Sequence, residues 1–386
     1  MPFAFRVEAR SQGARAGVLT TDHGSIETPV FMPVGTQGAV KGVSARDVWD
    51  TGARLILGNA YHLYLRPGVD LIARAGGLHT FVGWDGAMLT DSGGYQVFSL
   101  ASLMRVGDEG VTFRSHIDGS LHQFTPEAVM EYQARIGADI VMSFDSFGGI
   151  PSTRHDAERA VELTTNWAGR GLSATGARFS RYGYEQVVFG IVQGGEYADL
   201  RARSATELAA MDFPGYAIGG LSVGESKDAT WDLCESTAAL LPTDRPRYLM
   251  GMGTPLDLID AVARGVDMLD CVLPTRNARN GTVFSRDGKV VLRNAAYAND
   301  LAPLDGECGC IACQRHTRAY LRHLFLSNEM LGPMLATSHN LFFYADVMRA
   351  ARAAIVGGQF DAWRNAFVER FTRGDRESAA RTGVET

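Results

Sequence analysis

The sequence predicts a (β/α)8 barrel, a TIM barrel, with antiparallel strands before it and a zinc-binding insertion after its last strand. Eight short, continuous apolar runs alternate with helix-like segments, as expected for parallel strands that are buried on both faces. The length of 386 residues leaves room for a barrel of about 250 residues and additional segments. A doubly wound sheet is the alternative, but no Gly-x-Gly-x-x-Gly motif opens the first helix.

The N-terminal segment is predicted to form antiparallel strands that cap the barrel. Residues 5–9 alternate in polarity, and Gly24 lies in a turn between residues 18–20 and 26–28. We therefore assign residues 1–28 to this cap and residues 29–281 to the barrel core.

The barrel strands are predicted from the apolar runs alone. They are residues 30–34, 55–57, 87–89, 140–144, 187–192, 216–218, 247–250 and 268–269. Helices are predicted between most of them. Ser44 can cap one, and Thr125 and Thr254 each precede a proline that suits the first helical position. Another helix is expected at residues 155–167.

Two hairpins interrupt the alternation. Asp118-Gly119 lies between strand-like residues 112–117 and 121–124, inside an insertion at 97–124. Asp287-Gly288 lies between residues 283–285 and 290–292, which opens a hairpin and zinc-binding subdomain at 282–340. Residues 341–371 are predicted as helices that close the barrel, and residues 372–386 as a loose polar tail.

Composition indicates a globular protein without a membrane span. Hydrophobic residues make up 46% and charged residues 21%, and no apolar run approaches the about 20 residues that cross a bilayer. The N-terminus lacks the residue order of a signal peptide, so we expect a cytoplasmic protein. In a reducing compartment, five cysteines favour metal binding or catalysis over disulfides.

Charge is unevenly distributed along the chain. The net charge of −6 does not indicate a nucleic-acid-binding protein, yet residues 276–323 hold eight basic and four acidic residues. A basic face on an acidic body suits selective contact with a polyanion. An ordinary solvated surface is the alternative.

Polar side chains follow the predicted strands where they end. Because the carboxyl ends of barrel strands meet at one rim, we expect these residues to converge there. Carboxylates, amides and glycines together suit the edge of a purine, which offers donors and acceptors in one plane. Each residue alone is as well explained by a cap or turn. The rim positions are Asn59, Asp91, Asp145, Gln193, Gly220, Leu221 and Asp270.

The last strand leads into a cationic segment. Asp270 lies in an apolar run, where a carboxylate is costly unless it is paired or used. Arg276 and Arg279 follow in a stretch that we expect to be a loop suited to phosphate. The sequence therefore indicates a reactive aspartate beside a backbone-binding site, with a structural aspartate at a strand end as the alternative.

Three cysteines lie within six residues, at Cys308, Cys310 and Cys313. A tetrahedral structural zinc site needs one more ligand, and His316, His323 and His339 are the candidates. Spacing alone does not choose among them. Redox-active cysteines are a minor alternative.

Over nearly its whole length the chain resembles the bacterial tRNA-guanine transglycosylase family. The resemblance rests on the motifs at residues 31–36 (Phe-Met-Pro-Val-Gly-Thr), 57–63 (Leu-Gly-Asn-Ala-Tyr-His-Leu), 90–96 (Thr-Asp-Ser-Gly-Gly-Tyr-Gln), 219–225 (Gly-Gly-Leu-Ser-Val-Gly-Glu) and 270–276 (Asp-Cys-Val-Leu-Pro-Thr-Arg), together with the cysteine cluster. Motifs of this length in this order are specific.

The resemblance implies an enzyme that exchanges the wobble guanine of tRNAs with a GUN anticodon for a 7-deazaguanine. It implies Asp270 as the nucleophile at the ribose C1′ and Asp91 as the general acid/base. It further implies a homodimer that binds the tRNA anticodon loop and needs no nucleotide cofactor. The implied base contacts are Asp145, Gln193, Gly220 and Leu221, with Tyr95 and Met250 on the ring faces; Arg276 and Arg279 contact the RNA, and Cys308, Cys310, Cys313 and His339 bind zinc.

One segment departs from the family pattern. Bacterial members usually read Glu-Cys-Thr-Pro-Tyr-Pro after the aspartate that matches Asp145, whereas residues 146–151 here read Ser-Phe-Gly-Gly-Ile-Pro. The two glycines could make room for a bulkier base. Among the bases, 7-aminomethyl-7-deazaguanine (preQ1) is slightly favoured, and queuine is the alternative.

Two other functions remain open at this point. A non-catalytic, zinc-stabilised tRNA-binding subunit is disfavoured because Asp91 and Asp270 are both present. A barrel glycosidase with these two carboxylates as its pair leaves the basic residues Arg276 and Arg279 unexplained.

Overall fold

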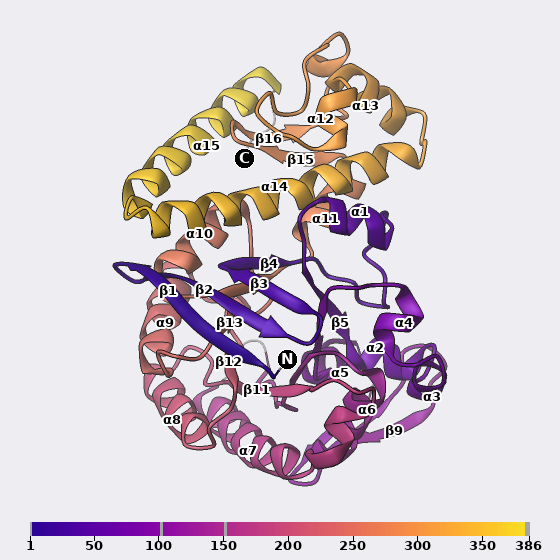
Figure 1. The fold of residues 1–386 in the computed structure, drawn as a ribbon, viewed down its shortest axis with the longest axis vertical. Coiled ribbons are helices and arrows are strands. Elements are labelled where there is room, and N and C mark those ends of the chain that lie inside the picture. Colours follow the sequence, from indigo (N-terminus) through magenta and orange to yellow (C-terminus); the bar gives the residue numbers. More distant parts are fainter. Residues whose placement is uncertain (1, 101–102, 150–152, 383–386) are drawn as a thin grey trace.

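Eight parallel strands form the centre of the molecule, as the sequence predicts. The computed structural model describes residues 2–100, 103–149 and 153–382. The strands neighbour one another in chain order, and Figure 1 shows helices around them. They are β4 (Val30–Met32), β5 (Leu55–Asn59), β6 (Ala87–Asp91), β10 (Ile140–Met142), β11 (Val187–Val192), β12 (Gly215–Ile218), β13 (Arg247–Leu249) and β14 (Met268–Asp270).

The barrel closes between its first two strands. β14 pairs with β4, and the peptide N–H of Leu57 on β5 donates to the Pro33 carbonyl at 2.9 Å just after β4. The Gly35 N–H donates in return to the Leu57 carbonyl at 2.7 Å. Closure leaves no free strand edge, so all eight strands are held in a defined register.

Helices cover the outside of the barrel and begin at the predicted caps. Ser44 and Thr254 each complete a capping box, and the Thr125 hydroxyl accepts a hydrogen bond from the Ala128 N–H. The helices up to β14 are α1 (Ala45–Asp50), α2 (Ala60–Leu65), α3 (Val69–Arg74), α4 (Leu78–Val82), α5 (Gly94–Leu100), α6 (Pro126–Ile136), α7 (Arg154–Ser173), α8 (Ala198–Ala209), α9 (Lys227–Leu240) and α10 (Pro255–Ala263).

The N-terminal strands close one end of the barrel. β1 (Ala4–Ser11), β2 (Ala14–Thr21) and β3 (Gly24–Thr28) form an antiparallel sheet. Leu19 and Ile26 from this sheet join the apolar cluster that fills the barrel interior. The interior is therefore packed at this end, and the carboxyl ends of the strands remain as the open rim.

The first insertion contains the predicted antiparallel hairpin and a third strand, which the sequence does not predict. β7 (Met104–Gly107) adds to β8 (Gly110–Arg114) and β9 (Leu121–Phe124). β8 ends at Arg114, three residues earlier than predicted. The Ser115 hydroxyl accepts from the Ile117 N–H at 3.1 Å, and this local bond bends the chain toward Asp118-Gly119.

The C-terminal region contains the predicted second hairpin and a metal-ligand cluster. β15 (Thr282–Ser285) and β16 (Gly288–Val291) pair through Asp287-Gly288, and η2 (Ala295–Tyr297), α12 (Ile311–Arg315) and α13 (Arg318–Leu326) follow. The long helix α14 (Leu331–Val356) then crosses between this subdomain and the barrel (Figure 1). It packs against β1, β2, β4 and α10, in the place of the eighth barrel helix.

The prediction of a loose tail from residue 372 is wrong for residues 372–382. The last helix, α15 (Phe360–Thr382), continues through them. Arg370 donates to the Asp287 carboxylate at 2.7 Å, and the backbone N–H of Lys289 donates to Asp375. These contacts anchor α15 to β16 and its turn, a long-range effect that local composition does not reveal.

No helix among residues 2–100, 103–149 and 153–382 is long and apolar enough to cross a membrane.

Candidate active site

The alternation of side chains along the strands explains why the polar residues at the rim face the barrel interior. Residues two apart on a strand face the same side, so a side chain at a strand end faces the same way as the apolar side chain two positions before it. The interior residues Leu89, Ile191, Tyr248 and Met268 all belong to the cluster inside the barrel. Two positions farther along lie, in the same order, Asp91, Gln193, Met250 and Asp270.

Asp270, the last residue of β14, is buried and held by two neutral donors. The Tyr248 hydroxyl donates to its Oδ1 at 2.6 Å, and the Gly251 N–H donates to the same oxygen at 2.7 Å. Burial raises the pKa of Asp270, although both donors favour the ionised form. Within the described residues no hydrogen bond engages Oδ2, so this oxygen can approach an electrophile.

Asp91 ends β6 on the same rim. It accepts hydrogen bonds from the Asn59 amide and from the Ala60 N–H, the latter at 3.2 Å. Burial raises the pKa of Asp91 to about 8, and the negative charge of Asp270 adds to this increase. Asp91 therefore holds a proton near neutral pH, while a base can withdraw it at modest cost.

Asp145 and Gln193 meet in front of β10 and β11. The Gln193 amide donates to Asp145 Oδ2 at 2.9 Å, and the Ser92 hydroxyl donates to Oδ1 at 2.8 Å. Burial raises the pKa of Asp145 despite these donors. The pair presents a carboxylate and an amide side by side, which can read donor and acceptor groups on the edge of a ring.

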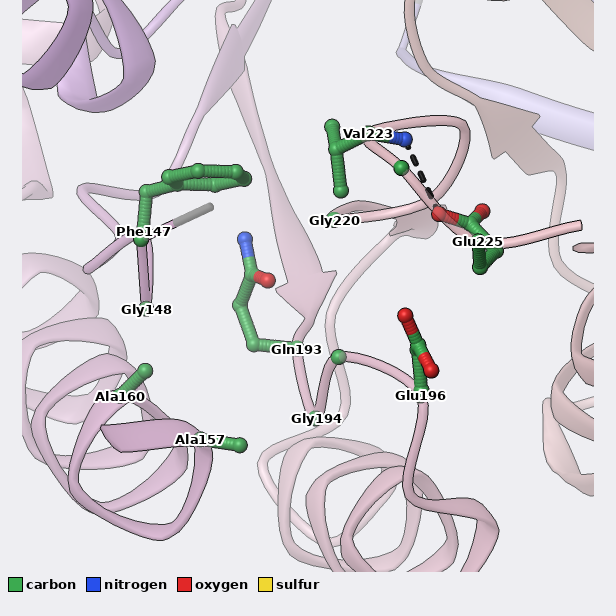
Figure 2. A pocket seen from close by; sticks show the side chains of 13 residues that line it. Phe147, Gly148, Ala157, Ala160, Gln193, Gly194, Glu196, Gly220, Val223 and Glu225 are labelled. Atoms are coloured by element: carbon green, nitrogen blue, oxygen red, sulfur yellow. Dashed lines mark hydrogen bonds between the residues drawn. The ribbon is translucent and has the colours of Figure 1, made fainter. Parts of the chain in front are cut away.

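A pocket opens beside this pair. Gln193 and Gly220 line it together with Phe147, Gly148 and Glu225 (Figure 2). A Cβ atom at Gly220 would lie 2.5 Å from Gln193 Oε1, and the φ angle of Gly220 is +63°. Only glycine fits this close approach, which leaves the backbone accessible to a flat ligand. The neighbouring Leu221 is buried.

The predicted ring-stacking residues lie at the rim as well. Tyr95 is 46% exposed on α5, and its ring contacts Phe147 edge-to-face with centroids 5.2 Å apart. Met250 directly follows β13 and packs on the interior cluster of the barrel. An exposed tyrosine ring next to a pocket can stack on a planar ligand.

The segment after Asp270 is a short helix and not the expected loop. α11 (Leu273–Arg279) begins with Pro274 at a position that favours helix initiation. Arg276 is exposed, whereas Arg279 is partly buried and donates to the Thr275 carbonyl at 2.9 Å. Burial lowers the pKa of Arg279, and the charge of Arg276 contributes to this decrease. Two guanidinium groups thus lie within two helical turns of Asp270.

The cysteine cluster selects its histidine in three dimensions. The His339 Nδ1 atom lies 3.3 Å from the Sγ atoms of Cys310 and Cys313 and 3.7 Å from that of Cys308. Ligands on a tetrahedral zinc ion lie about 3.6 Å apart, given bond lengths of about 2.3 and 2.1 Å. His339 Nε2 lies 2.7 Å from the Phe284 carbonyl. A hydrogen bond there assigns the proton to Nε2 and leaves Nδ1 free for a metal ion.

The donor set therefore fits a metal ion with four protein ligands. His316, one of the other candidates, stacks on Tyr320 with ring centroids 5.0 Å apart, and neither His316 nor His323 joins the cluster. Four protein ligands leave no open position for a substrate, so such a metal would be structural.

Sequence reasoning missed the residues that hold the rim carboxylates. The sequence predicts a strand at Tyr248 but no role for its hydroxyl. It likewise predicts no role for Ser92, which lies between Asp91 and Tyr95. A signal for Tyr248 exists in hindsight, because a tyrosine that points into a barrel interior needs a partner for its hydroxyl. Glu196, which lines the pocket, carries no local signal of this kind.

Known proteins are similar to this sequence over almost its full length. A family model described as Queuine tRNA-ribosyltransferase matches residues 10–373. A protein of this name from Pelotomaculum thermopropionicum is 53% identical over 369 residues, which cover 96% of this chain and 98% of that relative. Proteins of the same name are 54% identical in Caldanaerobacter subterraneus, with 96% and 97% covered, and 52% identical in Desulforamulus reducens, with 97% and 100% covered.

Proposed function

Because the chain belongs to the queuine tRNA-ribosyltransferase family of tRNA-guanine transglycosylases, we propose that it replaces the wobble guanine of GUN-anticodon tRNAs by a 7-deazaguanine. One observation carries this proposal beyond family membership. Asp270 keeps one carboxylate oxygen free at the rim, and a second carboxyl group of raised pKa, Asp91, lies near enough to interact with it electrostatically. A double displacement needs this combination of a nucleophile and a separate proton carrier.

In the first step, Asp270 Oδ2 attacks the ribose C1′ of the wobble nucleotide. A C1′–O bond forms as the C1′–N9 bond to guanine breaks, and guanine leaves with the proton that Asp91 donates. In the second step, the incoming base attacks C1′ through its N9 as Asp91 takes the N9 proton, and the bond to Asp270 breaks. Tyr248 and the Gly251 N–H stabilise the carboxylate that departs again. One glycosidic bond replaces another, so no nucleotide cofactor is required.

The base is proposed to bind between Tyr95 and Met250. Asp145 and Gln193 would read its edge, and the backbone of Gly220 and Leu221 would complete the set. The existing Gln193–Asp145 hydrogen bond supports this assignment, because it preorganises both groups before a base arrives. Of the candidate bases, preQ1 stays slightly ahead of queuine. Phe147 lines the pocket beside Gly148 and Gly149, so the departure from the family pattern acts on the base site itself.

The tRNA is proposed to approach over α11, where Arg276 and Arg279 can bind phosphates of the anticodon loop. A homodimer is proposed as well. The C-terminal subdomain exposes apolar residues that a second copy could cover: Leu326, Met330, Leu331 and Met334. The protein would act in the cytoplasm, where its tRNA substrate occurs.

Zinc is the proposed metal of the cluster formed by the three cysteines and His339. When bound, it would join α12 and the segment before it to α14, and the hydrogen bond of His339 Nε2 to the Phe284 carbonyl would link the site to β15. It would thereby stabilise the subdomain next to the proposed RNA site. Metal analysis of the purified protein and of a Cys310→Ser variant tests this assignment. About one zinc per chain is expected in the first and none in the second.

The experiment that tests the function is exchange of labelled guanine into tRNA by the purified protein, with preQ1 and queuine as competitors. Label is expected in tRNAs with a wobble guanine, and the stronger competitor identifies the preferred base. If tRNA binds but no label enters, the protein is a non-catalytic tRNA-binding subunit. Hydrolysis of a glycoside without tRNA would instead indicate a glycosidase.

A further inference from the structure

The pocket beside Gln193 continues beyond the residues proposed to hold the base. Its wall includes Gly194, Gly195 and Gly224, and the small side chains of Ala157 and Ala160 from α7. Glycine and alanine leave room where larger side chains would fill the space. A substituent that points away from the ring can therefore extend past Gln193 and Gly220.

Two carboxylates face this extension. Glu225 is already saturated: the Val223 N–H donates to its Oε2 at 3.0 Å, and the Thr230 hydroxyl donates to its Oε1 at 2.6 Å. Burial acts to raise the pKa of Glu225, but these donors and the Ser222 N–H outweigh it and lower the pKa. Glu225 is therefore an ionised group whose oxygens are occupied by its own loop.

Glu196 differs from Glu225 because no hydrogen bond or ion pair among the described residues engages its carboxylate. Figure 2 shows its carboxylate pointing toward the segment of Gly220 and Glu225, and the side chain is exposed. Of the ion pairs among the described residues, none includes Glu196, and the lining contains no lysine, arginine or histidine. The pocket thus holds an unused negative charge with nothing in its wall to neutralise it.

The turn that carries Glu196 is held in place from below. Arg201, a buried residue of α8, donates to the Gly195 carbonyl at 2.7 Å and to the carbonyls of Gly219 and Gly220 at 3.0 Å each. One guanidinium group thereby joins the Glu196 turn to the backbone proposed to bind the base. The distance between the charge and the base is thus fixed by packing.

We propose that Glu196 recognises the positive charge on the 7-substituent of the incoming base and so selects cationic 7-deazaguanines over guanine. The proposal rests on base exchange as the function, because it takes the base to bind at Gln193 and Gly220. The aminomethyl group of preQ1 and the secondary amine of queuine are both cationic at neutral pH, so Glu196 can recognise either base by its charge.

The test compares the wild type with Glu196→Gln and Glu196→Lys, using three bases as substrates. Guanine has no 7-substituent, 7-cyano-7-deazaguanine has a small neutral one, and preQ1 has a cationic one. Glu196→Gln is expected to raise the KM for preQ1 roughly 3- to 10-fold, the range for a partly solvated charge pair. The KM for the other two bases and every kcat should stay unchanged. Glu196→Lys should raise the KM for preQ1 further.

Asp232→Asn is the matched control, because it removes one exposed carboxylate from α9 outside the pocket. It should leave all three KM values unchanged. Ionic strength provides a second readout, since added salt should raise the KM for preQ1 in the wild type but not in Glu196→Gln. Equal shifts for all three bases, or no shift for preQ1, would overturn the proposal.

Failure of the inference can be separated from failure of the function. If the wild type exchanges guanine but the preference for preQ1 does not depend on Glu196, only the inference falls. If the wild type exchanges nothing, calorimetry on the free protein still tests the role of Glu196, by measuring how tightly preQ1 and the cyano base bind. A loss of affinity for preQ1 but not for the cyano base in Glu196→Gln supports the role of Glu196. Equal affinities of the wild type and Glu196→Gln for preQ1 refute it.

Discussion

Two strands of the barrel have an aspartate at or next to each end, and the partners of these aspartates differ between the two ends. Asp139 precedes β10 and Asp267 precedes β14, at the end that the N-terminal sheet closes. His23 lies 2.7 Å and His79 3.2 Å from Asp139, and Arg15 forms a fully buried ion pair with Asp267. The ion pair of Arg15 with Asp267 and the contact of His23 with Asp139 hold the N-terminal strands to the barrel.

At the opposite ends of the same strands, Asp145 and Asp270 receive neutral donors only. Their partners are side-chain hydroxyls, an amide and a backbone N–H. Burial also acts to raise the pKa of Asp139, but hydrogen bonds from both histidines outweigh it and lower the pKa to about 2, whereas the pKa of Asp145 and of Asp270 is raised. Burial also raises the pKa of Asp267, although Arg15 acts to lower it, so burial and a raised pKa do not by themselves make a carboxylate reactive. Asp267 differs from Asp145 and Asp270 in its position, because it lies in an ion pair at the closed end of the barrel, whereas they lie at the open rim.

Asp270→Asn tests the reactive end most directly. We expect base exchange to fall by about 10⁴-fold or more, because an amide cannot form the covalent intermediate. Thermal unfolding should change little, since Tyr248 and Gly251 can still donate to the remaining oxygen. Exchange of labelled guanine and a melting curve measure the two effects. Substantial retained exchange would exclude Asp270 as the nucleophile.

Arg15→Met tests the structural end. Removing one partner of a buried ion pair leaves Asp267 unpaired, so we expect a loss of about 3–5 kcal/mol in the free energy of unfolding. The kcat of the folded fraction should stay near that of the wild type. Denaturant unfolding provides the measurement. The double variant Arg15→Met/Asp267→Leu is the control, and it should recover part of the lost stability, because it removes the unpaired Asp267 carboxylate while the buried Arg247 beside it remains.

Asp91→Asn separates catalysis from stability at the rim. Exchange should fall about 10²- to 10³-fold, as expected for loss of a general acid/base. The pKa of Asp91 is about 8, well above its ordinary value of 3.8, so between these two pH values the folded state retains a proton that the unfolded state has released. Wild-type stability therefore declines as pH rises through this window.

The asparagine variant lacks this titration. Relative to the wild type it should gain about 5 kcal/mol of stability between pH 4 and pH 9. Unfolding curves at both pH values measure the difference. A constant difference across the window would contradict the raised pKa of Asp91.

Asp139→Asn gives the opposite sign at the closed end and a smaller effect. The pKa of Asp139 is lowered to about 2 from its ordinary value of 3.8. The contribution of Asp139 to the free energy of unfolding is therefore complete above pH 4 and disappears as pH falls through 2. We expect the variant to lose about 2 kcal/mol at neutral pH. The loss should vanish near pH 2, which unfolding at several pH values would show. Guanine exchange should be unaffected.

Much of this protein is visible in local sequence. The eight barrel strands follow from apolar runs, because a strand buried on both faces must be apolar at every position. The helix caps at Ser44, Thr125 and Thr254 follow from short-range hydrogen bonds that a few adjacent residues complete. The rim positions of Asp91, Asp145 and Asp270 follow from their places just at or after strand ends.

Other features depend on residues that are distant in the sequence. Spacing leaves three histidines open as the fourth metal ligand, and only the packing of α14 against α12 brings His339 to the cysteines. The helix through residue 382 depends on contacts with the turn at Asp287. The Glu196 carboxylate, which no ion pair among the described residues engages, joins the site only when α7, the turn after β11 and the segment after β12 meet around one pocket.

The sequence by itself determined the barrel, the polar residues of its rim and the three cysteines, because periodicity, caps and short spacings are properties of neighbouring residues. Which side chains meet each aspartate depends on the tertiary structure. Asp139 and Asp145 are six residues apart and lie on either side of β10, and nothing in their local sequence distinguishes them. Their different pKa shifts arise from partners that folding brings from elsewhere in the chain, His23 and His79 for one and Ser92 and Gln193 for the other.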